Sequence, residues 1–150
     1  MSKPIITVQN LKRTYAGSGK APTYALKGIT FEIAEGEFVA IMGRSGSGKS
    51  TLLHQLSLID TPTEGVIFLN GIDVTRFSEN QKTDFRLEHL GYVFQEYALI
   101  VELNALENVY LPAMALGESA AQYKKHAAEL LSLVGLGERL DHYPQELSGG

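Results

Sequence analysis

The chain has 150 residues, about the length of one domain, and 44% of them are hydrophobic, which is enough for a globular core. Its net charge is −4 and its sequence pI is about 5.5, so the composition gives no basic patch and does not suggest nucleic-acid binding. It lacks cysteine, an apolar run approaching the roughly 20 residues of a membrane span, and the apolar core of a signal peptide at its start, and we therefore expect a cytosolic protein.

The first part of the chain predicts β-structure. Residues 5–9 form a strand, and residues 11–15 are its more polar continuation. Residues 16–22 are rich in Gly, Ser and Pro and predict a loop. Apolar and polar side chains then alternate over residues 29–33, which predicts a half-buried strand. Glu35-Gly36 is expected to be a hairpin turn that leads into the next strand.

A glycine-rich motif follows. Residues 43–51 read Gly-Arg-Ser-Gly-Ser-Gly-Lys-Ser-Thr and fit the phosphate-loop pattern G-x-x-x-x-G-K-[ST]. The glycines let the backbone gather several N–H groups into a concave anion site, to which the N-terminus of the next helix adds its dipole. Lys49 can reach the β- and γ-phosphates, and the Ser50 hydroxyl is placed to ligate Mg²⁺. The candidate nucleotide-binding residues are Gly43, Ser45, Gly46, Ser47, Gly48, Lys49, Ser50 and Thr51.

The segments on either side decide between this interpretation and a flexible Gly/Ser turn. Residues 38–42, Phe-Val-Ala-Ile-Met, form a continuous apolar run that predicts a strand buried on both faces. After the loop, apolar residues recur at helical spacing, at Leu52, Leu53, Leu56 and Ile59. This helix should end by Thr61, because Pro62 disfavours helical geometry at the preceding residue. The order strand, loop, helix favours phosphate binding.

The next elements are a hairpin, a helix and a strand. Asn70-Gly71 separates the apolar runs 66–69 and 72–74, which is a strong hairpin signal. Residues 78–81 have the spacing of a capping box and open a helix through about Glu88. Residues 91–94 then predict a buried strand. Antiparallel pairs beside a phosphate loop, which belongs to a parallel-sheet layout, indicate an added β layer on an α/β core.

The last third of the chain is predicted to be helical. Asn104 with Glu107 resembles another cap, and Pro112 is expected to interrupt the helix that follows. Residues 119–134 predict an amphipathic helix that ends at Gly135. The residues expected on its apolar face are Ala127, Leu130, Leu131 and Val134.

The final residues complete a set of motifs. Leu147-Ser148-Gly149-Gly150 alone is a weak signal, because Ser-Gly-Gly is common in linkers. With the phosphate loop upstream and Val93-Phe94-Gln95 between them, it resembles the signature motif of the ATP-binding cassette (ABC) family of transporter ATPases. Residues 105–109, Ala-Leu-Glu-Asn-Val, and 143–147, Tyr-Pro-Gln-Glu-Leu, look most like the branch that serves lipoprotein release and macrolide-type export.

The resemblance implies a role for each matched position. Residues 43–51 correspond to the Walker A motif, and Tyr15 to the aromatic residue that stacks on adenine. Because stacking needs only a π-face, Tyr15→Phe is expected to be nearly silent. Gln95 corresponds to the residue that contacts Mg²⁺ and the attacking water and marks the hinge facing the membrane subunit. Ser148, Gly149 and Gly150 would face the γ-phosphate on a second subunit in a head-to-tail dimer. The alternatives are a core or strand-edge tyrosine at 15 and a surface loop residue at 95.

The implied fold is an α/β P-loop NTPase of the ABC type, with an antiparallel β subdomain and a helical subdomain that is C-terminally incomplete. Residues 1–94 would form the β subdomain with the P-loop core, and residues 95–150 the helical subdomain. In the family the Walker B Asp, the catalytic Glu, the D-loop and the switch His follow the signature, and the sequence stops at Gly150. Residues 1–150 alone are therefore expected to be inactive, so whether they are an enzyme stays open.

The implied function is the ATP-binding subunit of an ABC transporter that drives export or release of a substrate. Its cofactors would be ATP and Mg²⁺, with Lys49 and Gln95 in the catalytic site. Its partners would be a transmembrane permease subunit and a second ATPase subunit, which place it at the inner face of the cell membrane. One alternative is a non-catalytic nucleotide-binding or dimerising fragment. Another is a soluble ABC protein of repair or translation, against which the lack of basic patches argues.

Overall fold

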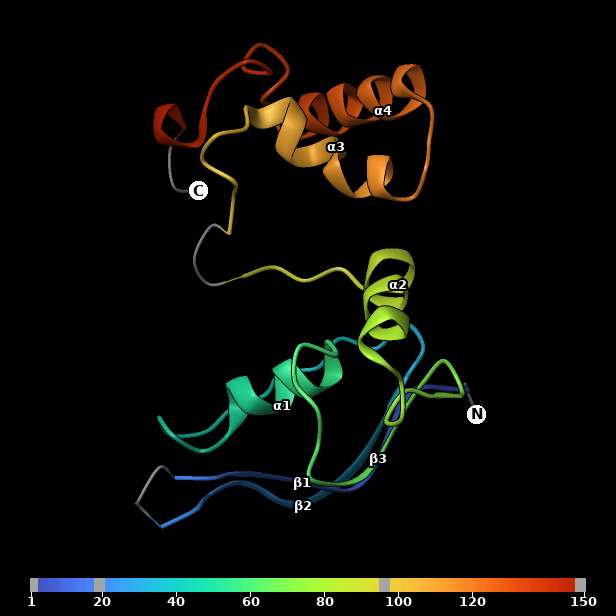
Figure 1. Cartoon of the computed structure of the whole chain (residues 1–150), viewed down its shortest axis with the longest axis vertical. Coiled ribbons are helices and arrows are strands. Elements are labelled where there is room, and N and C mark those ends of the chain that lie inside the picture. The colour runs from blue at the N-terminus through green and yellow to red at the C-terminus, as the bar shows by residue number, and fades with distance from the viewer. Residues whose placement is uncertain (1–2, 18–20, 95–97, 148–150) are drawn as a thin grey trace. The chain divides into compact units, whose positions relative to one another are not determined.

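The computed structural model describes residues 3–17, 21–94 and 98–147 (Figure 1). The chain divides into two compact units, residues 1–90 and 91–150. The functional boundary at residue 95 that the family resemblance implies stays a prediction. Within the described ranges, no helix is long and apolar enough to cross a membrane.

The first unit is built on an antiparallel sheet in the order β2-β1-β3-β4. Its strands are β1 (Pro4–Tyr15), β2 (Thr23–Ala34), β3 (Glu64–Leu69) and β4 (Ile72–Asp73). The strands predicted over residues 5–15, 29–33 and 66–69 are therefore confirmed. The turn between β3 and β4 is also confirmed, because Asn70 and Gly71 both have positive φ, at 48° and 79°, as a two-residue type I′ hairpin requires.

Two helices cover the sheet in this unit. Helix α1 (Lys49–Leu56) lies over β1 and β2, and α2 (Glu79–His89) lies near β3 (Figure 1). The predicted capping box at the start of α2 is confirmed. Strand β1 has a partner strand on each side, and its residues Val8 and Leu11 are fully buried in the apolar core of this unit. The apolar core consists of Val8, Leu11, Leu26, Leu52, Leu58, Ile67, Leu69, Val74 and Phe85.

Two strand predictions are wrong. Neither residues 38–42 nor residues 91–94 form a strand. In these segments the exposed fraction is 98% for Phe38, 88% for Met42 and 97% for Val93. The expected turn at Glu35-Gly36 is present, but no hairpin follows it. An apolar run forms a buried strand only where neighbouring strands pair with its backbone and cover its faces. No strand among the described residues does so, and the described sheet has no parallel pair.

The second unit contains α3 (Ala105–Ala115), α4 (Ala120–Leu133) and the short 3-10 helix η1 (Pro144–Glu146). The capping box formed by Asn104 and Glu107 is confirmed. The predicted interruption at Pro112 is wrong, because α3 continues through it to Ala115. Pro112 lies in the last turn, so its missing N–H removes a bond only near the helix end, and its carbonyl still accepts from the Leu116 N–H at 3.1 Å.

Helix α4 has the expected bounds but a narrower apolar face. It ends as predicted at Gly135, which has positive φ. The Gly135 N–H donates to the Ser132 carbonyl and the Leu136 N–H donates to the Leu131 carbonyl, which is the pattern of a Schellman motif. Ala127 and Leu131 are buried. The other two residues predicted on this face, Leu130 and Val134, are 41% and 70% exposed. Within the unit α4 packs on α3, and a single neighbouring helix covers only a narrow stripe.

Candidate functional site

The phosphate loop is closed by its own lysine. The Lys49 ammonium donates hydrogen bonds to the carbonyl oxygens of Gly43 and Arg44, both at 2.9 Å. The Ser47 N–H bonds the same Arg44 carbonyl at 3.2 Å. The cation therefore lies against the loop backbone from which a phosphate would be bound, and an ammonium keeps further donor capacity for such a ligand.

Gly48 is required where the loop meets the sheet. Its φ is +94°, and a Cβ at this position would lie 2.5 Å from the carbonyl oxygen of Ala25 and 3.1 Å from Leu26 Cδ2. No side chain can be accommodated at that distance from a backbone oxygen. The last turn of the loop therefore packs directly on β2, and this contact positions the start of α1.

Helix α1 starts immediately after this contact. Gly48 is its N-cap, and within the described part of the chain no side chain caps the helix by a hydrogen bond. The first N–H groups of an α-helix have no intrahelical acceptor, and they carry the positive end of the helix dipole. The first turn, Lys49 to Thr51, thus offers N–H donors, a hydroxyl and an ammonium at one place, which suits an anion.

A pocket of about 360 Å³ lies in front of this turn. Tyr15 from β1 and the start of β2 form one side of it. Its lining residues are Tyr15, Thr23, Tyr24, Ala25, Ser45, Gly46, Gly48, Lys49, Ser50 and Thr51. The structure therefore brings Tyr15 together with six of the eight predicted loop residues. Gly43 and Ser47 do not line the pocket, and Gln95, Ser148, Gly149 and Gly150 lie outside the described residues.

Tyr15 has two partners that were not expected from the sequence. Its hydroxyl donates a hydrogen bond to Asp60 Oδ2 at 2.9 Å. Arg13 holds the same carboxylate with two donors, Nε to Oδ2 at 2.8 Å and Nη2 to Oδ1 at 2.7 Å. The Arg13 Cζ atom also lies 4.5 Å from the centroid of the Tyr15 ring. The i, i+2 spacing of Arg13 and Tyr15 in a strand was one available signal, because such residues share a face. Asp60 is 45 residues from Tyr15, and nothing local links them.

The contacts of Asp60 change its acidity. Partial burial raises the pKa of its carboxyl, but hydrogen bonds from Tyr15 and the Thr61 N–H, together with the Arg13 charge, outweigh burial and leave the pKa below its usual value. Asp60 is therefore a carboxylate at neutral pH and accepts hydrogen bonds only.

Whether the pocket could hold a divalent cation depends on the side chains that could act as its ligands. No group of three or more His, Cys, Asp or Glu in the described ranges could hold a metal ion. The Ser50 hydroxyl lines the pocket and is an oxygen ligand of the kind that Mg²⁺ takes. An ion there would take the Ser50 oxygen as one ligand and would also be bound by phosphate oxygens and waters, as Mg²⁺ usually is beside nucleotides.

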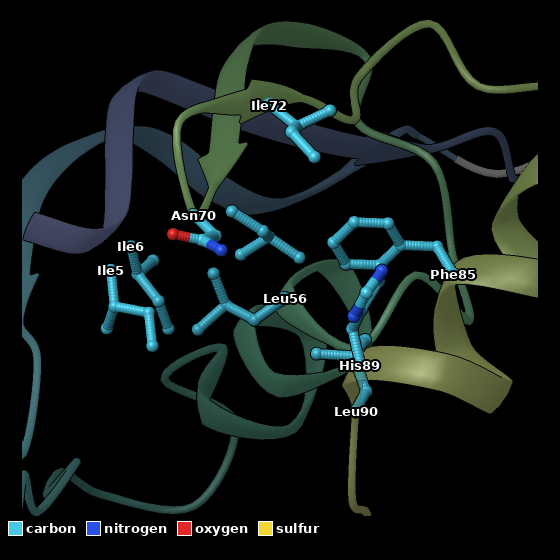
Figure 2. Close-up of a pocket in the computed structure, with 9 residues that line it drawn as sticks. Ile5, Ile6, Leu56, Asn70, Ile72, Phe85, His89 and Leu90 are labelled. Carbon is cyan, nitrogen blue, oxygen red and sulfur yellow. The ribbon is translucent and has the colours of Figure 1, made fainter.

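A second cavity in the first unit, of about 250 Å³, has a different character. Figure 2 shows Ile5 and Ile6 around it with Leu56 of α1 and with Phe85 and His89 of α2. Asn70 and His89 are its only polar lining side chains. Its lining is mostly apolar and includes no lysine, arginine or free helix N-terminus, so the pocket at Lys49 is the better candidate for a phosphate site.

Known proteins match this chain along nearly its whole length. The family model described as ABC transporter matches residues 26–150. An uncharacterized ABC transporter ATP-binding protein of Methanocaldococcus jannaschii is 49% identical over 97% of this chain. The lipoprotein-releasing system ATP-binding protein LolD of Novosphingobium aromaticivorans is 42% identical over all of it. Macrolide export ATP-binding/permease proteins also match, one from Shewanella at 44% identity. These names agree with the branch that the sequence resembles.

A solved structure shares the fold. A dimeric ATP-binding cassette in a post-hydrolysis state bound to ADP and Pi superposes with a TM-score of 0.88 at 39% identity, over 96% of this chain and 63% of that one. The chain spans 65% of the length of the Methanocaldococcus relative and 66% of the LolD protein. The family match and the shared fold confirm the predicted α/β P-loop architecture of the ABC type. The chain belongs to the ABC transporter family.

Proposed function

We propose that this chain binds Mg-ATP in the pocket between Tyr15 and the start of α1. The observation that carries the proposal is that Tyr15 and six residues of the phosphate loop line one pocket. The N–H groups of the loop and of the first turn of α1 would bind the phosphate oxygens. Lys49 would exchange its loop carbonyls for the β- and γ-phosphates, Ser50 would ligate Mg²⁺, and the Tyr15 ring would stack on adenine.

The complete protein would use this site to drive transport. The relatives named above include a lipoprotein-releasing system and macrolide exporters, and the solved cassette is dimeric. We therefore propose an ATP-binding subunit that works through a separate membrane permease, at the inner face of the membrane, and pairs head to tail with a second ATPase subunit. Ser148, Gly149 and Gly150 would complete the site of that second subunit, and Gln95 would contact Mg²⁺ and the attacking water.

Phosphoryl transfer depends mainly on positioning and on stabilising charge. Mg²⁺, when bound, would neutralise charge that develops on the β- and γ-phosphates. The chain's own contribution is the N–H groups of the loop and the ammonium of Lys49, which the carbonyls of Gly43 and Arg44 hold beside the pocket. The alternative is a nucleotide-binding piece that does not hydrolyse ATP. Both candidates require the same pocket, and they differ only in turnover.

Calorimetric titration of the full-length protein with Mg-ATP tests the binding site. Removing one partner of a buried, charged contact costs roughly 2–5 kcal/mol, so Lys49→Ala should weaken ATP binding more than tenfold. Lys125→Ala is the matched control, because that side chain is 80% exposed and carries the same charge far along the chain. An equal dissociation constant in wild type and Lys49→Ala would refute the site. Steady ATP turnover by the full-length protein would exclude the non-catalytic alternative.

A further inference from the structure

We propose that Asp60, held by Arg13, is a positioning residue for the nucleotide base, because it fixes the Tyr15 ring at the side of the phosphate pocket. The proposal rests on the proposed function, since it concerns how that site presents its aromatic surface. It gives the Tyr15 hydroxyl a role that stacking alone does not require.

The Tyr15 ring is anchored at both ends. Tyr15 is the last residue of β1, and its backbone pairs with Thr23 of β2. Its hydroxyl is held 2.9 Å from Asp60 Oδ2. The side chain is still 37% exposed, so a ring surface remains for a ligand. A ring fixed in advance loses less side-chain freedom when a base stacks on it, and this strengthens binding without any new contact.

Arg13 limits how a base can approach. Its guanidinium lies over one ring face, with Cζ 4.5 Å from the centroid, so that face is occupied. A base must therefore use the opposite face. The two-pronged contact with Asp60 holds the guanidinium in a fixed plane, as expected for a bidentate pair. Arg13 thus orients Asp60 and covers the rear of the ring that Asp60 fixes.

Asp60 does not read the base itself. Oδ2 accepts from Tyr15 and Arg13 Nε, while Oδ1 pairs with Arg13 Nη2 and accepts from the Thr61 N–H at 2.8 Å. With both oxygens engaged, the carboxylate has little capacity left for a ligand donor. Losing Asp60 should therefore weaken binding of adenine and guanine nucleotides alike, which separates positioning from base recognition.

The anchor is tied to the phosphate site through α1. The helix starts at Lys49, and the backbone N–H of Asp60 bonds the carbonyl of His54 near its C-terminal end at 3.2 Å. Helix α1 thus has Lys49 at its start, and Asp60, which holds the Tyr15 ring, lies just beyond its end. The phosphate site and the anchor of the stacking surface are therefore connected through α1.

The test is calorimetric binding of ATP, GTP and inorganic tripolyphosphate to the full-length protein. The variants are Tyr15→Phe, Asp60→Asn and the double substitution. Stacking contributes a factor of about ten or more, so losing the ring's position should weaken ATP and GTP binding about three- to tenfold in each single variant. For Tyr15→Phe this replaces the nearly silent outcome expected from stacking alone, because the hydroxyl is bonded to Asp60. The double variant should be no weaker than the single ones, and tripolyphosphate, which has no base, should bind all of them equally.

Glu64→Gln is the matched control. The Lys12 ammonium on β1 donates a hydrogen bond to Glu64 Oε2 at 2.6 Å. Glu64 is therefore another carboxylate that pairs with a cation of β1, but it does not contact Tyr15. It should leave all affinities unchanged. Equal ATP affinity in wild type, Tyr15→Phe and Asp60→Asn would overturn the proposal while leaving the proposed function intact. So would an equal loss for tripolyphosphate, or the same loss in Glu64→Gln. Failure of the wild type to bind any of the three ligands would refute the proposed function itself.

Discussion

The ammonium of Lys82 donates a hydrogen bond to the hydroxyl of Thr61 and so joins α2 to the segment that follows α1. The same ammonium bonds Glu79 Oε1 at 2.7 Å, and the Lys82 side chain is only 5% exposed. A second link comes from Arg86, whose Nη1 donates to the Leu58 carbonyl at 2.7 Å. The two cations of α2 therefore hold the segment in which Asp60 lies.

Substituting Lys82 with alanine should destabilise the folded protein. The change removes a charged donor from the Thr61 hydroxyl and leaves an apolar gap, and losses of this kind cost about 1–3 kcal/mol. Lys125→Ala is the control, because Lys125 also pairs with a glutamate on its own helix, at 3.9 Å, but is 80% exposed. Exposed pairs of that kind are worth about 0–1 kcal/mol. Urea unfolding of the full-length variants measures both, and equal midpoints would contradict this account.

Substituting Gln55 with leucine should stabilise the protein. Gln55 lies on α1, is fully buried, and neither its Oε1 nor its Nε2 has a hydrogen-bond partner within the described residues. A buried polar group without a partner costs about 1–3 kcal/mol, and leucine removes that cost with a small change of volume. Gln9→Leu, at an exposed position of β1, should change stability by less than about 0.5 kcal/mol. A lower thermal midpoint for Gln55→Leu than for wild type would contradict this expectation.

Acid should remove the contribution of Asp60 to stability. Its folded-state pKa is lowered from an ordinary value of 3.8, so the unfolded chain binds a proton more readily than the folded one. The contribution is complete above 3.8 and is lost as pH falls through the lower folded-state pKa. The difference in free energy of unfolding between wild type and Asp60→Asn should therefore stay constant from about pH 7 to pH 5 and become smaller below about pH 4. A gap that widens in acid would mean that the carboxyl is not stabilised in its charged form.

Local features of the fold were predictable from the sequence because each depends on a few neighbouring residues. Asn70 and Gly71 readily adopt the positive φ angles of a type I′ turn. In the capping box, the side chains of Ser78 and Gln81 each accept a hydrogen bond from the backbone N–H of the other residue. The same is true of Gly135, which ends α4 with bonds to the preceding turn. The phosphate loop belongs to this class as well, since its pattern is contiguous.

Features that depend on distant residues were not predictable. The apolar run 38–42 predicts a buried strand, but whether it pairs depends on strands elsewhere in the chain. The narrow buried face of α4 depends on how many neighbours it has, which its own periodicity does not encode. The anchor of Tyr15 depends on Asp60, 45 residues away, and an acidic residue after a helix is too common to single out.

Residues 1–150 expressed alone should aggregate and should not hydrolyse ATP above background. Phe38, Met42 and Val93 are at least 88% exposed, and exposed apolar segments without strand partners promote association between chains. The lack of turnover follows from the family resemblance, which places the Walker B Asp, the catalytic Glu and the switch His after Gly150. Light scattering, thermal unfolding and phosphate release, each with and without Mg-ATP, test both parts. A cooperative transition accompanied by steady turnover would contradict them.

The most direct test of the proposed site is a crystal structure of the full-length protein with Mg²⁺ and a non-hydrolysable ATP analogue. We expect the phosphates to lie on N–H groups of the loop and of the first turn of α1, with the Lys49 ammonium moved from the Gly43 carbonyl to the phosphate chain. We also expect the adenine on the face of the Tyr15 ring opposite Arg13, with the Tyr15 hydroxyl still bonded to Asp60. Phosphates bound away from Lys49, or a base that does not contact Tyr15, would contradict the proposed site.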